Sequence, residues 1–422
     1  SFTYNSPTYR AHHDFQVLPN GNILILAWEV IEKEEVIANG RDTTLLSDQK
    51  LWPEHIVEIE PIGVDSGKIV WAWHAWDHLI QDFDTTKLNY GNVGEHPEKI
   101  DLNYIRPGKD GRDWQHANSL HYNPSLDQIL ISVLYFDEVW MIDHHTTTQE
   151  AQTAKGDLLF RWGNPQTYQQ GDESDKKLFG QHHAHWIEEG LPDEGKIMVF
   201  NNGVGRSDSL FSNVVIIDPT IENGSYSKNN GGKYLPEDYD WVLNNNTPTD
   251  FYSRFISGAQ QLPNGNILIN DGAHGTFFEI NAAEEKVWEY VNPVTIFGIA
   301  TQGNMVVNPS GEGTNTVFRA TKFPKYYPAF IGKDVLPQEP IELNPDLSLC
   351  ELPDTTINLP TLFLIYPNPV TDLVAIQINT LVTKKVTLEL LDMSGKLIQT
   401  TQINAGGTIA FFDIQSLYEG IY

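Results

Sequence analysis

The chain has 422 residues and a formal net charge of −29, with 27 Lys and Arg residues against 56 Asp and Glu residues. This balance argues against nucleic-acid binding, because no basic stripe is present to neutralise phosphates. No apolar run approaches the length of a membrane span, and the single cysteine, Cys350, excludes an internal disulfide framework. The sequence starts at Ser1 with no initiator Met and no signal segment, so we expect a mature or trimmed product.

A repeated unit runs through most of the chain. Residues 11–29 read AHHDFQVLPNGNILILAWE, which is a histidine pair, an apolar step, a Pro-Asn-Gly turn and an apolar strand. The same order of features returns at 113–143 and 181–203, and residues 258–280 nearly repeat LPNGNIL. Units of about 40–50 residues with four short strands are typical of a β-propeller, and about 330 residues would hold roughly six or seven of them.

Composition divides the chain into three parts. Long polar insertions interrupt the repeats, and on a propeller such loops decorate one face. A proline-rich stretch without long apolar runs then reads as a linker. The predicted fold is all-β: a propeller over residues 1–336, a linker over 337–360 and a small Ig-like β-sandwich over 361–422.

The last part shows alternating strands at Leu373–Ile378 and Val386–Leu391 with a hairpin turn at Asp392–Lys396. Its motifs are YPNP followed by an aspartate at 366–372, DMSGK at 392–396 and GIY at 420–422. They resemble the C-terminal sorting domain of type IX secretion cargo. The resemblance implies export by the type IX machinery and a secreted or cell-surface location. That family continues with another strand after GIY, so we expect the sequence to stop inside the domain.

His116 and Asn118 form the first candidate site. They lie two residues apart on a predicted strand, so both side chains leave the same face of the pleat. A histidine beside an amide can hold one small polar group. The alternative is a satisfied polar pair that holds neighbouring turns of a blade together.

The propeller part also resembles the arylsulfotransferase, or aryl-sulfate sulfotransferase, family. The resemblance rests on HHDF at 12–15 with LPNGNIL, DWxHxNS at 113–119, FRWGNP at 160–165, Gln181-His182 and the second LPNGNIL at 262–268. It spans residues 1 to about 295. The family implies a six-bladed propeller with a site on its central axis, a small aryl sulfate as donor, a phenol as acceptor, and no metal or other cofactor.

By that resemblance, His182 is the nucleophile that is transiently sulfurylated, and His13, His116 and Asn118 bind the sulfuryl oxygens. Sulfuryl transfer spreads negative charge over three equatorial oxygens, so donors aimed at that charge are needed, as in phosphoryl transfer. A neutral imidazole can attack sulfur, hold the group covalently and release it to a second phenol in a ping-pong scheme.

One residue departs from the family pattern. The family carries an arginine in a segment like SVRxF, and here Leu134 takes its place in SVLYF. Loss of one such donor typically costs about 10²–10³ in rate, so we expect weak turnover. Arg10, Arg161 and Arg206 are candidates to replace it, with Arg10 and Arg161 predicted to bind substrate. His274 is predicted to line the channel.

Two other classes of function stay open. The chain can be a non-catalytic extracellular binding or structural propeller that kept the histidines and lost the arginine. It can also be a metal-dependent enzyme, because His183-x-His185 has a spacing that places both rings on one face of a strand. No carboxylate partner motif accompanies that pair, which favours solvent-facing or loop-bonded histidines.

Overall fold

The computed structural model describes residues 3–109, 111–207, 209–243, 251–304, 306, 313–323, 327–330, 333, 339–347, 363–366, 373–378, 383–391 and 397–414. Two compact units make up the chain, Ser1–Pro345 and Asp346–Tyr422. Most of the predicted linker, 337–360, lies outside the described residues, and the exact boundaries at 336 and 361 stay predictions.

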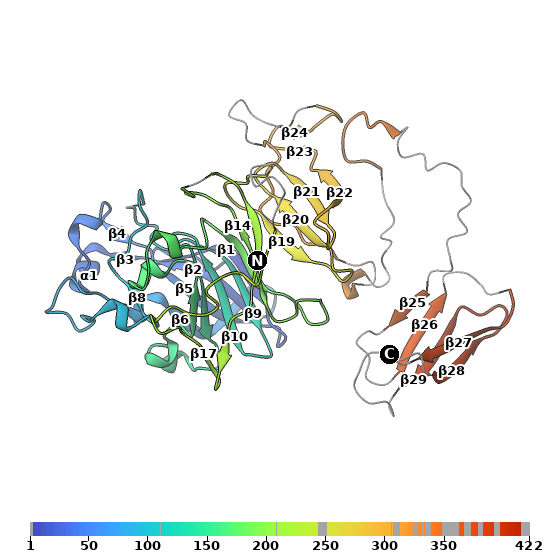
Figure 1. The fold of residues 1–422 in the computed structure, drawn as a ribbon, viewed down its shortest axis with the longest axis horizontal. Coiled ribbons are helices and arrows are strands. Elements are labelled where there is room, and N and C mark those ends of the chain that lie inside the picture. Colours follow the sequence, from blue (N-terminus) through green and yellow to red (C-terminus); the bar gives the residue numbers. More distant parts are fainter. Residues whose placement is uncertain are drawn as a thin grey trace. The chain divides into compact units, whose positions relative to one another are not determined.

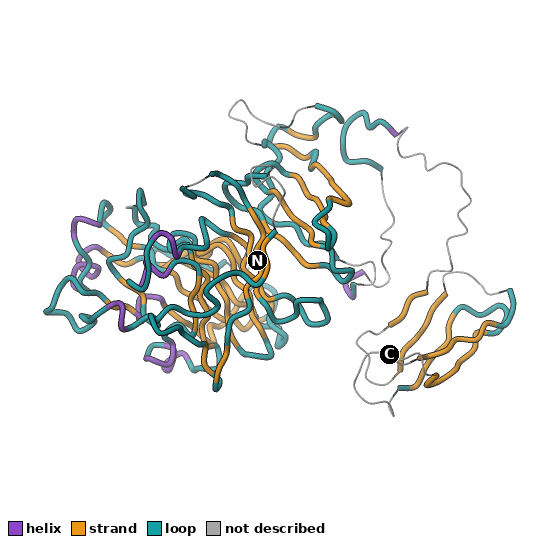
Figure 2. The backbone as a smooth tube through the Cα atoms, viewed as in Figure 1, coloured by secondary structure: helices purple, strands orange, loops and turns teal. Residues whose placement is uncertain are grey.

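The first unit contains four four-stranded antiparallel sheets, which we number 1–4 (Figures 1 and 2). Sheet 1 has the order β1 (Tyr9–Val17), β2 (Ile23–Glu29), β5 (Glu54–Ile62), β6 (Ser66–His74). Sheet 2 comprises β9 (Ala117–Asn123), β10 (Gln128–Val133), β11 (Glu138–Asp143) and β12 (Phe160–Trp162). Sheet 3 comprises β13 (His182–Trp186), β14 (Ile197–Asn201), β15 (Asn213–Ile217) and β18 (Trp241–Val242). Sheet 4 comprises β19 (Gly258–Gln261), β20 (Ile267–Asp271), β21 (Thr276–Ile280) and β22 (Lys286–Val291).

Short elements decorate these sheets. Two-stranded ribbons pair β3 (Ile31–Glu32) with β4 (Lys50–Leu51), β7 (Leu79–Ile80) with β8 (Ile100–Asp101), β16 (Ile221–Glu222) with β17 (Ser225–Tyr226), and β23 (Val294–Thr295) with β24 (Gly298–Ile299). The α-helices are α1 (Lys33–Ala38) and α2 (Thr148–Ala151). Single 3₁₀ turns are η1 (Thr43–Leu45), η2 (Ala75–His78), η3 (Val93–Glu95), η4 (Ala154–Gly156), η5 (Pro165–Tyr168), η6 (Glu173–Asp175) and η7 (Pro328–Phe330).

The described part of the chain is therefore all-β with few, short helices and has a propeller-like arrangement of sheets, as predicted. The central strand β15 is buried along its whole length, because sheet 3 packs against sheet 2 on one face and sheet 4 on the other. Of the six blades predicted, four four-stranded sheets lie among the described residues. The number six stays a prediction.

Side chains tie the first strands of sheets 1–3 together. Asp14 Oδ2 on β1 accepts a hydrogen bond from Leu120 N at 2.9 Å, and two residues further along both strands Gln16 Oε1 accepts from Tyr122 N at 2.6 Å. On the other side of β9, Asn118 Nδ2 donates to the carbonyl oxygen of residue 181 at 2.7 Å. Further along β9 and β13, the backbone N–H of residue 186 approaches the His121 ring. The partners advance together on all three strands, so β1, β9 and β13 run parallel and begin at the same end.

The second unit contains two sheets. One has the order β25 (Phe363–Tyr366), β26 (Leu373–Ile378), β29 (Ile409–Asp413), and the other pairs β27 (Val386–Leu391) with β28 (Leu397–Ile403). Ile403 and Ala410 form a small core that joins them, with Leu388 packed against it. The two predicted strands are confirmed. The predicted hairpin turn at 392–396 and the motif residues 367–372 and 420–422 lie outside the described residues.

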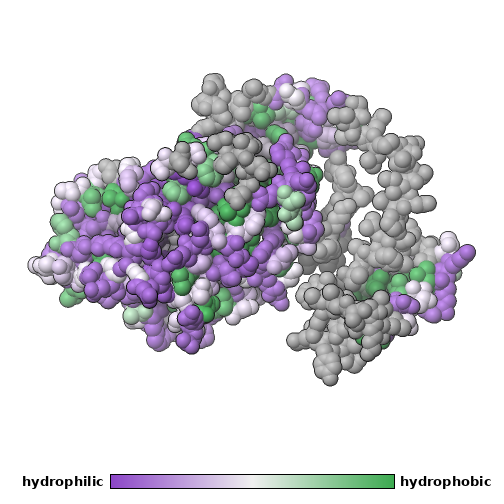
Figure 3. All heavy atoms as spheres, viewed as in Figure 1, coloured by the Kyte–Doolittle hydropathy of each residue, from purple (hydrophilic) through white to green (hydrophobic). Residues whose placement is uncertain are grey.

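The face of the molecule seen in Figure 3 is mostly hydrophilic where it is coloured. Within the described ranges, the longest helices are far too short to cross a membrane.

A chain that ends at Pro345 keeps all four large sheets, because these lie within the first compact unit. We expect it to unfold cooperatively with the same Tm as that unit in the full chain, measured by circular dichroism. Loss of cooperative unfolding would show that the second unit contributes to the fold of the first.

Candidate functional site

The first strands of sheets 1–3 each have an irregular backbone at or near a histidine, within β1, just before β9 and in β13. His13, His116 and His183 have left-handed φ values of 51°, 52° and 52°. The pairing register shifts at each place: between Ala11 and Phe15 in β1, between Ala117 and Ser119 in β9, and between His182 and His185 in β13. Such bulges re-aim side chains and concentrate next to functional sites, where strain is retained.

His13 is oriented by a buried relay. Glu54 Oε2 lies 2.8 Å from His12 Nε2, and His12 Nδ1 lies 2.7 Å from His13 Nδ1. Burial raises the pKa of Glu54 well above its usual range and lowers the pKa of His12 to about 3, so we take this pair as neutral. The protonated carboxyl then donates to His12 Nε2, and His12 Nδ1–H donates to His13 Nδ1. That tautomer leaves His13 Nε2–H as a free donor.

His116 lies against His13, with ring centroids 4.7 Å apart. Its Nδ1 donates to Asp113 Oδ2 at 2.5 Å, which fixes the ring so that Nε2 faces away from Asp113. Glu54 also anchors this region, because its Oε1 accepts a hydrogen bond from Ala117 N at 2.7 Å. His13 and His116, expected together from the sequence, are brought into contact.

His182, the neighbour of His183, is held in place by hydrogen bonds to a side chain and to a backbone carbonyl. Its Nδ1 lies 2.8 Å from Asn202 Oδ1 and 3.2 Å from the carbonyl oxygen of Gly180. Asn202 Nδ2 donates to the carbonyl oxygens of Ser253 and Ile256, which orients the amide so that Oδ1 faces the ring. Both partners of Nδ1 are acceptors, so Nδ1 carries the proton and Nε2 keeps its lone pair.

Burial lowers the pKa of His182 to about 3, against a smaller raising effect of its hydrogen bond to Asn202, and the charges of His116 and His13 lower it further. Burial, followed by the charges of His12 and His116, lowers the pKa of His13 to about 3. His13 and His182 are therefore neutral imidazoles, and Nε2 of His182 keeps its lone pair.

Asn118, two residues after His116, is buried, and one end of its side-chain amide is used in a structural hydrogen bond. Its Nδ2 donates to the carbonyl oxygen of Gln181, and its Oδ1 has no hydrogen-bond partner among the described residues. Gln181 in turn donates from Nε2 to the carbonyl oxygens of Val133 and Glu138. Asn118 thus holds the start of β13, where His182 lies, against β9.

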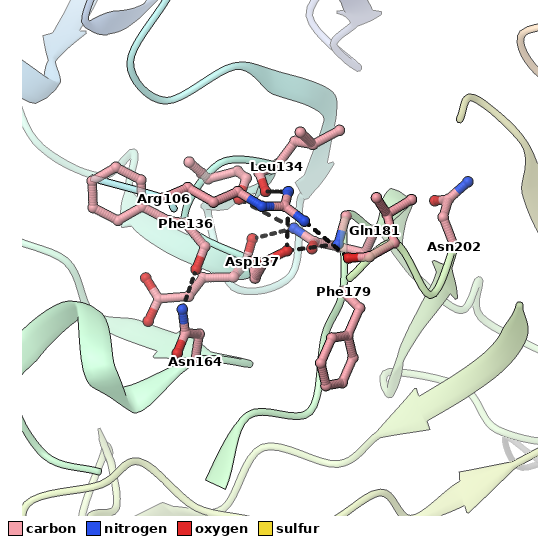
Figure 4. Close-up of polar contacts among 12 residues, drawn as sticks. Arg106, Leu134, Phe136, Asp137, Asn164, Phe179, Gln181 and Asn202 are labelled. Carbon is pink, nitrogen blue, oxygen red and sulfur yellow. Dashed lines mark hydrogen bonds and ion pairs between the residues drawn. The ribbon is translucent and has the colours of Figure 1, made fainter. Parts of the chain in front are cut away.

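Leu134 lies in the turn between β10 and β11, and an arginine from another segment reaches this turn (Figure 4). Arg106 Nη1 donates to the carbonyl oxygen of Leu134 at 3.1 Å, and its Nη2 donates to the carbonyl oxygen of Val204 at 3.0 Å. Nη1 also lies 3.3 Å from Asp137 Oδ1. The same Asp137 oxygen accepts from Gly180 N, whose carbonyl contacts His182.

Asp137 has a second cationic partner, because Lys176 Nζ lies 2.7 Å from its Oδ2. Asp137 is fully buried, and the side chains of Arg106 and Lys176 are 11% and 9% exposed. Two cations against one carboxylate leave a net positive charge at this turn. Sequence reasoning missed Arg106 because it lies in the insertion 74–110, outside every repeated motif.

Arg319 is a second missed cation. Its Nη2 lies 2.9 Å from Asp14 Oδ2 on β1, and the neighbouring Phe318 ring lies 6.0 Å from the His13 ring. The charge of Arg319 contributes to the lowered pKa of His13. No signal in the sequence places this segment, which follows sheet 4, beside the first strand.

The remaining predicted substrate-binding residues do not join the histidines. Arg161 is fully buried on β12, the strand of sheet 2 farthest from β9, and pairs with Glu138 at 2.6 Å. Its other donors go to Lys99 O and Thr167 Oγ1. This ion pair links β12 to β11 within sheet 2. Removing Arg161 would leave the carboxylate of Glu138 buried without a charged partner, which is costly.

Arg10 is exposed on β1, and Arg206 stacks on the rings of Phe179 and Phe211. His274 lies in the turn between β20 and β21, where its Nδ1 is 2.9 Å from both oxygens of Asp271. His183 and His185 stack on each other with centroids 4.4 Å apart.

Two family models match the chain. The model described as "Arylsulfotransferase (ASST)" matches residues 2–306, and the model described as "Secretion system C-terminal sorting domain" matches residues 364–422. No curated protein sequence matches. Similar solved structures include a protein of unknown function from Bacteroides caccae, at 12% identity over 70% of this chain and 72% of that chain with a TM-score of 0.34. They also include the periplasmic gluconolactonase of Pseudomonas aeruginosa, at 9% identity over 94% and 87% with a TM-score of 0.29. Likenesses this weak carry no functional argument.

We expect His182 to stay neutral, as the Nδ1–H tautomer, from pH 8 to pH 5, because burial lowers its pKa to about 3. An ordinary histidine, with a pKa near 6.5, would be about 97% protonated at pH 5. Ring ¹⁵N shifts of histidine-labelled protein report the tautomer, and the His182→Gln variant assigns the signal. A titration midpoint near pH 6.5 would contradict the assignment.

Proposed function

Because the chain belongs to the arylsulfotransferase family, we propose that it moves a sulfuryl group from an aryl sulfate to a phenolic acceptor through a covalent intermediate on His182. The sorting domain directs the protein to the cell surface or the extracellular space, as its motifs predicted. The observation that carries the proposal is the environment of His182: a neutral ring with Nδ1–H held by two fixed acceptors.

In the first step, the lone pair of His182 Nε2 attacks the sulfur, the N–S bond forms and the bond from sulfur to the aryl oxygen breaks. The aryl oxygen leaves as a phenolate, which a pKa near 10 makes tolerable. The sulfurylated ring keeps its Nδ1 proton and becomes cationic. Asn202 Oδ1 and the Gly180 carbonyl face that proton, so both stabilise the intermediate as its charge develops.

In the second step, a phenol oxygen attacks the sulfur and the N–S bond breaks, which restores neutral His182. The phenol proton passes to a basic group or to solvent. His13 Nε2–H supplies a donor for the sulfuryl oxygens, His116, whose Nδ1–H is taken by Asp113, packs against His13 and holds it in place, and Asn118 keeps β13 in position. This scheme needs no nucleotide and no cofactor.

We propose that Arg106 takes the place of the arginine that Leu134 lacks. Leu134 contributes its backbone carbonyl to Arg106, so the guanidinium lies at the turn where the family's side chain would begin. Arg106 and Lys176 outweigh Asp137 there, which gives the site a local positive charge within a protein of net charge −29. That local charge offsets the long-range repulsion of an anionic donor.

The non-catalytic propeller remains the second candidate, favoured by the absence of an arginine at position 134. In either case we propose a six-bladed propeller, with β1, β9 and β13 bordering a central axis. The parallel course of these strands and the contact of Arg319 with β1 support that arrangement.

Incubation with 4-nitrophenyl sulfate should add one sulfuryl group to the protein, located on His182 by peptide mass spectrometry. His182→Ala should abolish both the adduct and 4-nitrophenol release, because the nucleophile is gone. His145→Ala, which changes an exposed histidine, is the matched control and should form the adduct normally. A folded wild type with neither adduct nor turnover would favour the binding propeller.

Arg106→Gln should lower the rate of His182 sulfurylation by about 10²–10³, the usual effect of losing one donor to the developing charge. Arg112→Gln, which removes an exposed arginine paired with Asp48, should change the rate little. Leu134→Arg should restore part of the rate in the Arg106→Gln background. Single-turnover kinetics measure all three, with Tm as the folding control. Equal rates for Arg106→Gln and wild type would refute the role of Arg106.

A further inference from the structure

We propose that sheet 1 carries a binding site for a divalent transition-metal cation, of the kind that takes Zn²⁺, formed by Glu29, His55 and His74. The three residues come from β2, β5 and β6, the strands of sheet 1 beyond β1. One potential ligand atom from each lies within 4.8 Å of the other two. The site is separate from the His182 group and does not depend on the proposed sulfuryl transfer.

Strand pairing creates this cluster. His55 and His74 are direct partners in the antiparallel pair β5–β6, and their rings stack with centroids 5.1 Å apart and an interplanar angle of 5°. Glu29 is the last residue of β2, the strand on the other side of β5. Glu54, the residue before His55, points to the opposite face of β5 and contacts His12. The two sites therefore use opposite faces of one strand.

Two atoms of the cluster are buried and unpartnered. His55 Nδ1 and Glu29 Oε1 have no hydrogen-bond partner among the residues that the structure describes. His55 is only 1% exposed, so water does not compensate its ring nitrogen from outside. Buried polar atoms are nearly always paired, and leaving one unpaired is costly. A cation coordinated by both atoms would satisfy them together.

The surroundings of His55 select the tautomer that a metal needs. His55 Nε2 lies 3.1 Å from the Tyr4 hydroxyl, and Tyr4 stacks on Tyr9 with centroids 4.4 Å apart. When Nε2–H donates to the Tyr4 oxygen, Nδ1 keeps its lone pair. Metal-bound histidines typically donate their other ring N–H to such an outer partner, which fixes the ring.

His74 and Glu29 complete the set. His74 Nδ1 lies 3.0 Å from Glu29 Oε2, a distance that either a shared proton or a common cation explains. Ligands of a tetrahedral zinc ion with bonds of about 2.0–2.1 Å lie roughly 3.3 Å apart, so binding requires the ligand atoms, which lie within 4.8 Å of one another, to approach and one of the two stacked rings to turn its lone pair toward the ion. Two imidazoles and one carboxylate form a three-ligand set with a fourth position open to water. The side chains of His74 and Glu29 are 29% and 18% exposed, which gives an ion access from solvent.

The ligand types also narrow the choice of ion. Imidazole nitrogen suits Zn²⁺, Cu²⁺, Ni²⁺ and Co²⁺, whereas Mg²⁺ and Ca²⁺ prefer sites made of oxygen ligands. The bound ion would link three strands of sheet 1 and, through Tyr4, the segment that precedes β1. Because it binds the folded state, it would stabilise sheet 1.

The test is a titration of untagged, chelator-treated full-length protein with ZnCl₂ by isothermal titration calorimetry. We expect one site per chain that His74→Gln and Glu29→Gln each weaken at least tenfold, and no binding of Mg²⁺. His145→Gln, an exposed histidine near Asp127, should leave the site unchanged. Zn²⁺ should also raise the Tm of the wild type more than that of either ligand variant.

A second arm separates this site from the histidines around His182. His116→Gln should retain the Zn²⁺ site, and the visible absorption of bound Co²⁺ should be the same in His116→Gln and wild type. The proposal is overturned if the wild type binds no Zn²⁺. It is also overturned if His74→Gln and Glu29→Gln, both folded by circular dichroism, bind as tightly as wild type, or if binding is lost only in His116→Gln. Those outcomes would leave Glu29 and His74 as a hydrogen-bonded pair.

Discussion

Side-chain hydrogen bonds between parallel first strands are the constraint on which the candidate site depends. β1, β9 and β13 belong to different sheets, so no continuous ladder joins them; Asp14 and Asn118 bridge them instead. Because these bridges fix a common end, His13 and His116, which are distant in sequence, come into contact there. Asp14 and Asn118 therefore fix the positions of the strands, and the histidines are not needed for that task.

Burial then decides which chemistry is accessible. Desolvation lowers the pKa of His13 and His182 to about 3, so both rings stay neutral and His182 keeps a nucleophilic lone pair. Neutral rings alone, however, do little for an anionic transition state. The cations come from elsewhere in the chain: Arg106 from the insertion before β9, and Arg319 from the segment after sheet 4.

The sequence predicted those features of the fold and the site that repeats and family motifs indicate. Repeats indicated an all-β, propeller-like fold, and the resemblance to the arylsulfotransferase motifs led to His13, His116 and His182. Arg161 was expected at the substrate because it lies in a family motif, yet it pairs with Glu138 on the outermost strand of sheet 2. Arg106 could not have been found in this way, since only tertiary contact joins an irregular insertion to a hairpin turn.

The turn at Leu134 carries a positive charge although the residue at position 134 is a leucine, because Arg106 from another segment lies there. Arg106 is held by the carbonyl oxygen of Leu134, a group that every residue at this position supplies, so its placement does not depend on the side chain there. Asp137 fixes the guanidinium, and its own burial is compensated because Lys176 and Gly180 N bind the same carboxylate. The carbonyl oxygen of Gly180, two residues before His182, accepts a hydrogen bond from His182 Nδ1–H. Arg106 and His182 therefore contact one hydrogen-bonded segment. A positive charge at this turn is therefore a property of the folded segment rather than of position 134.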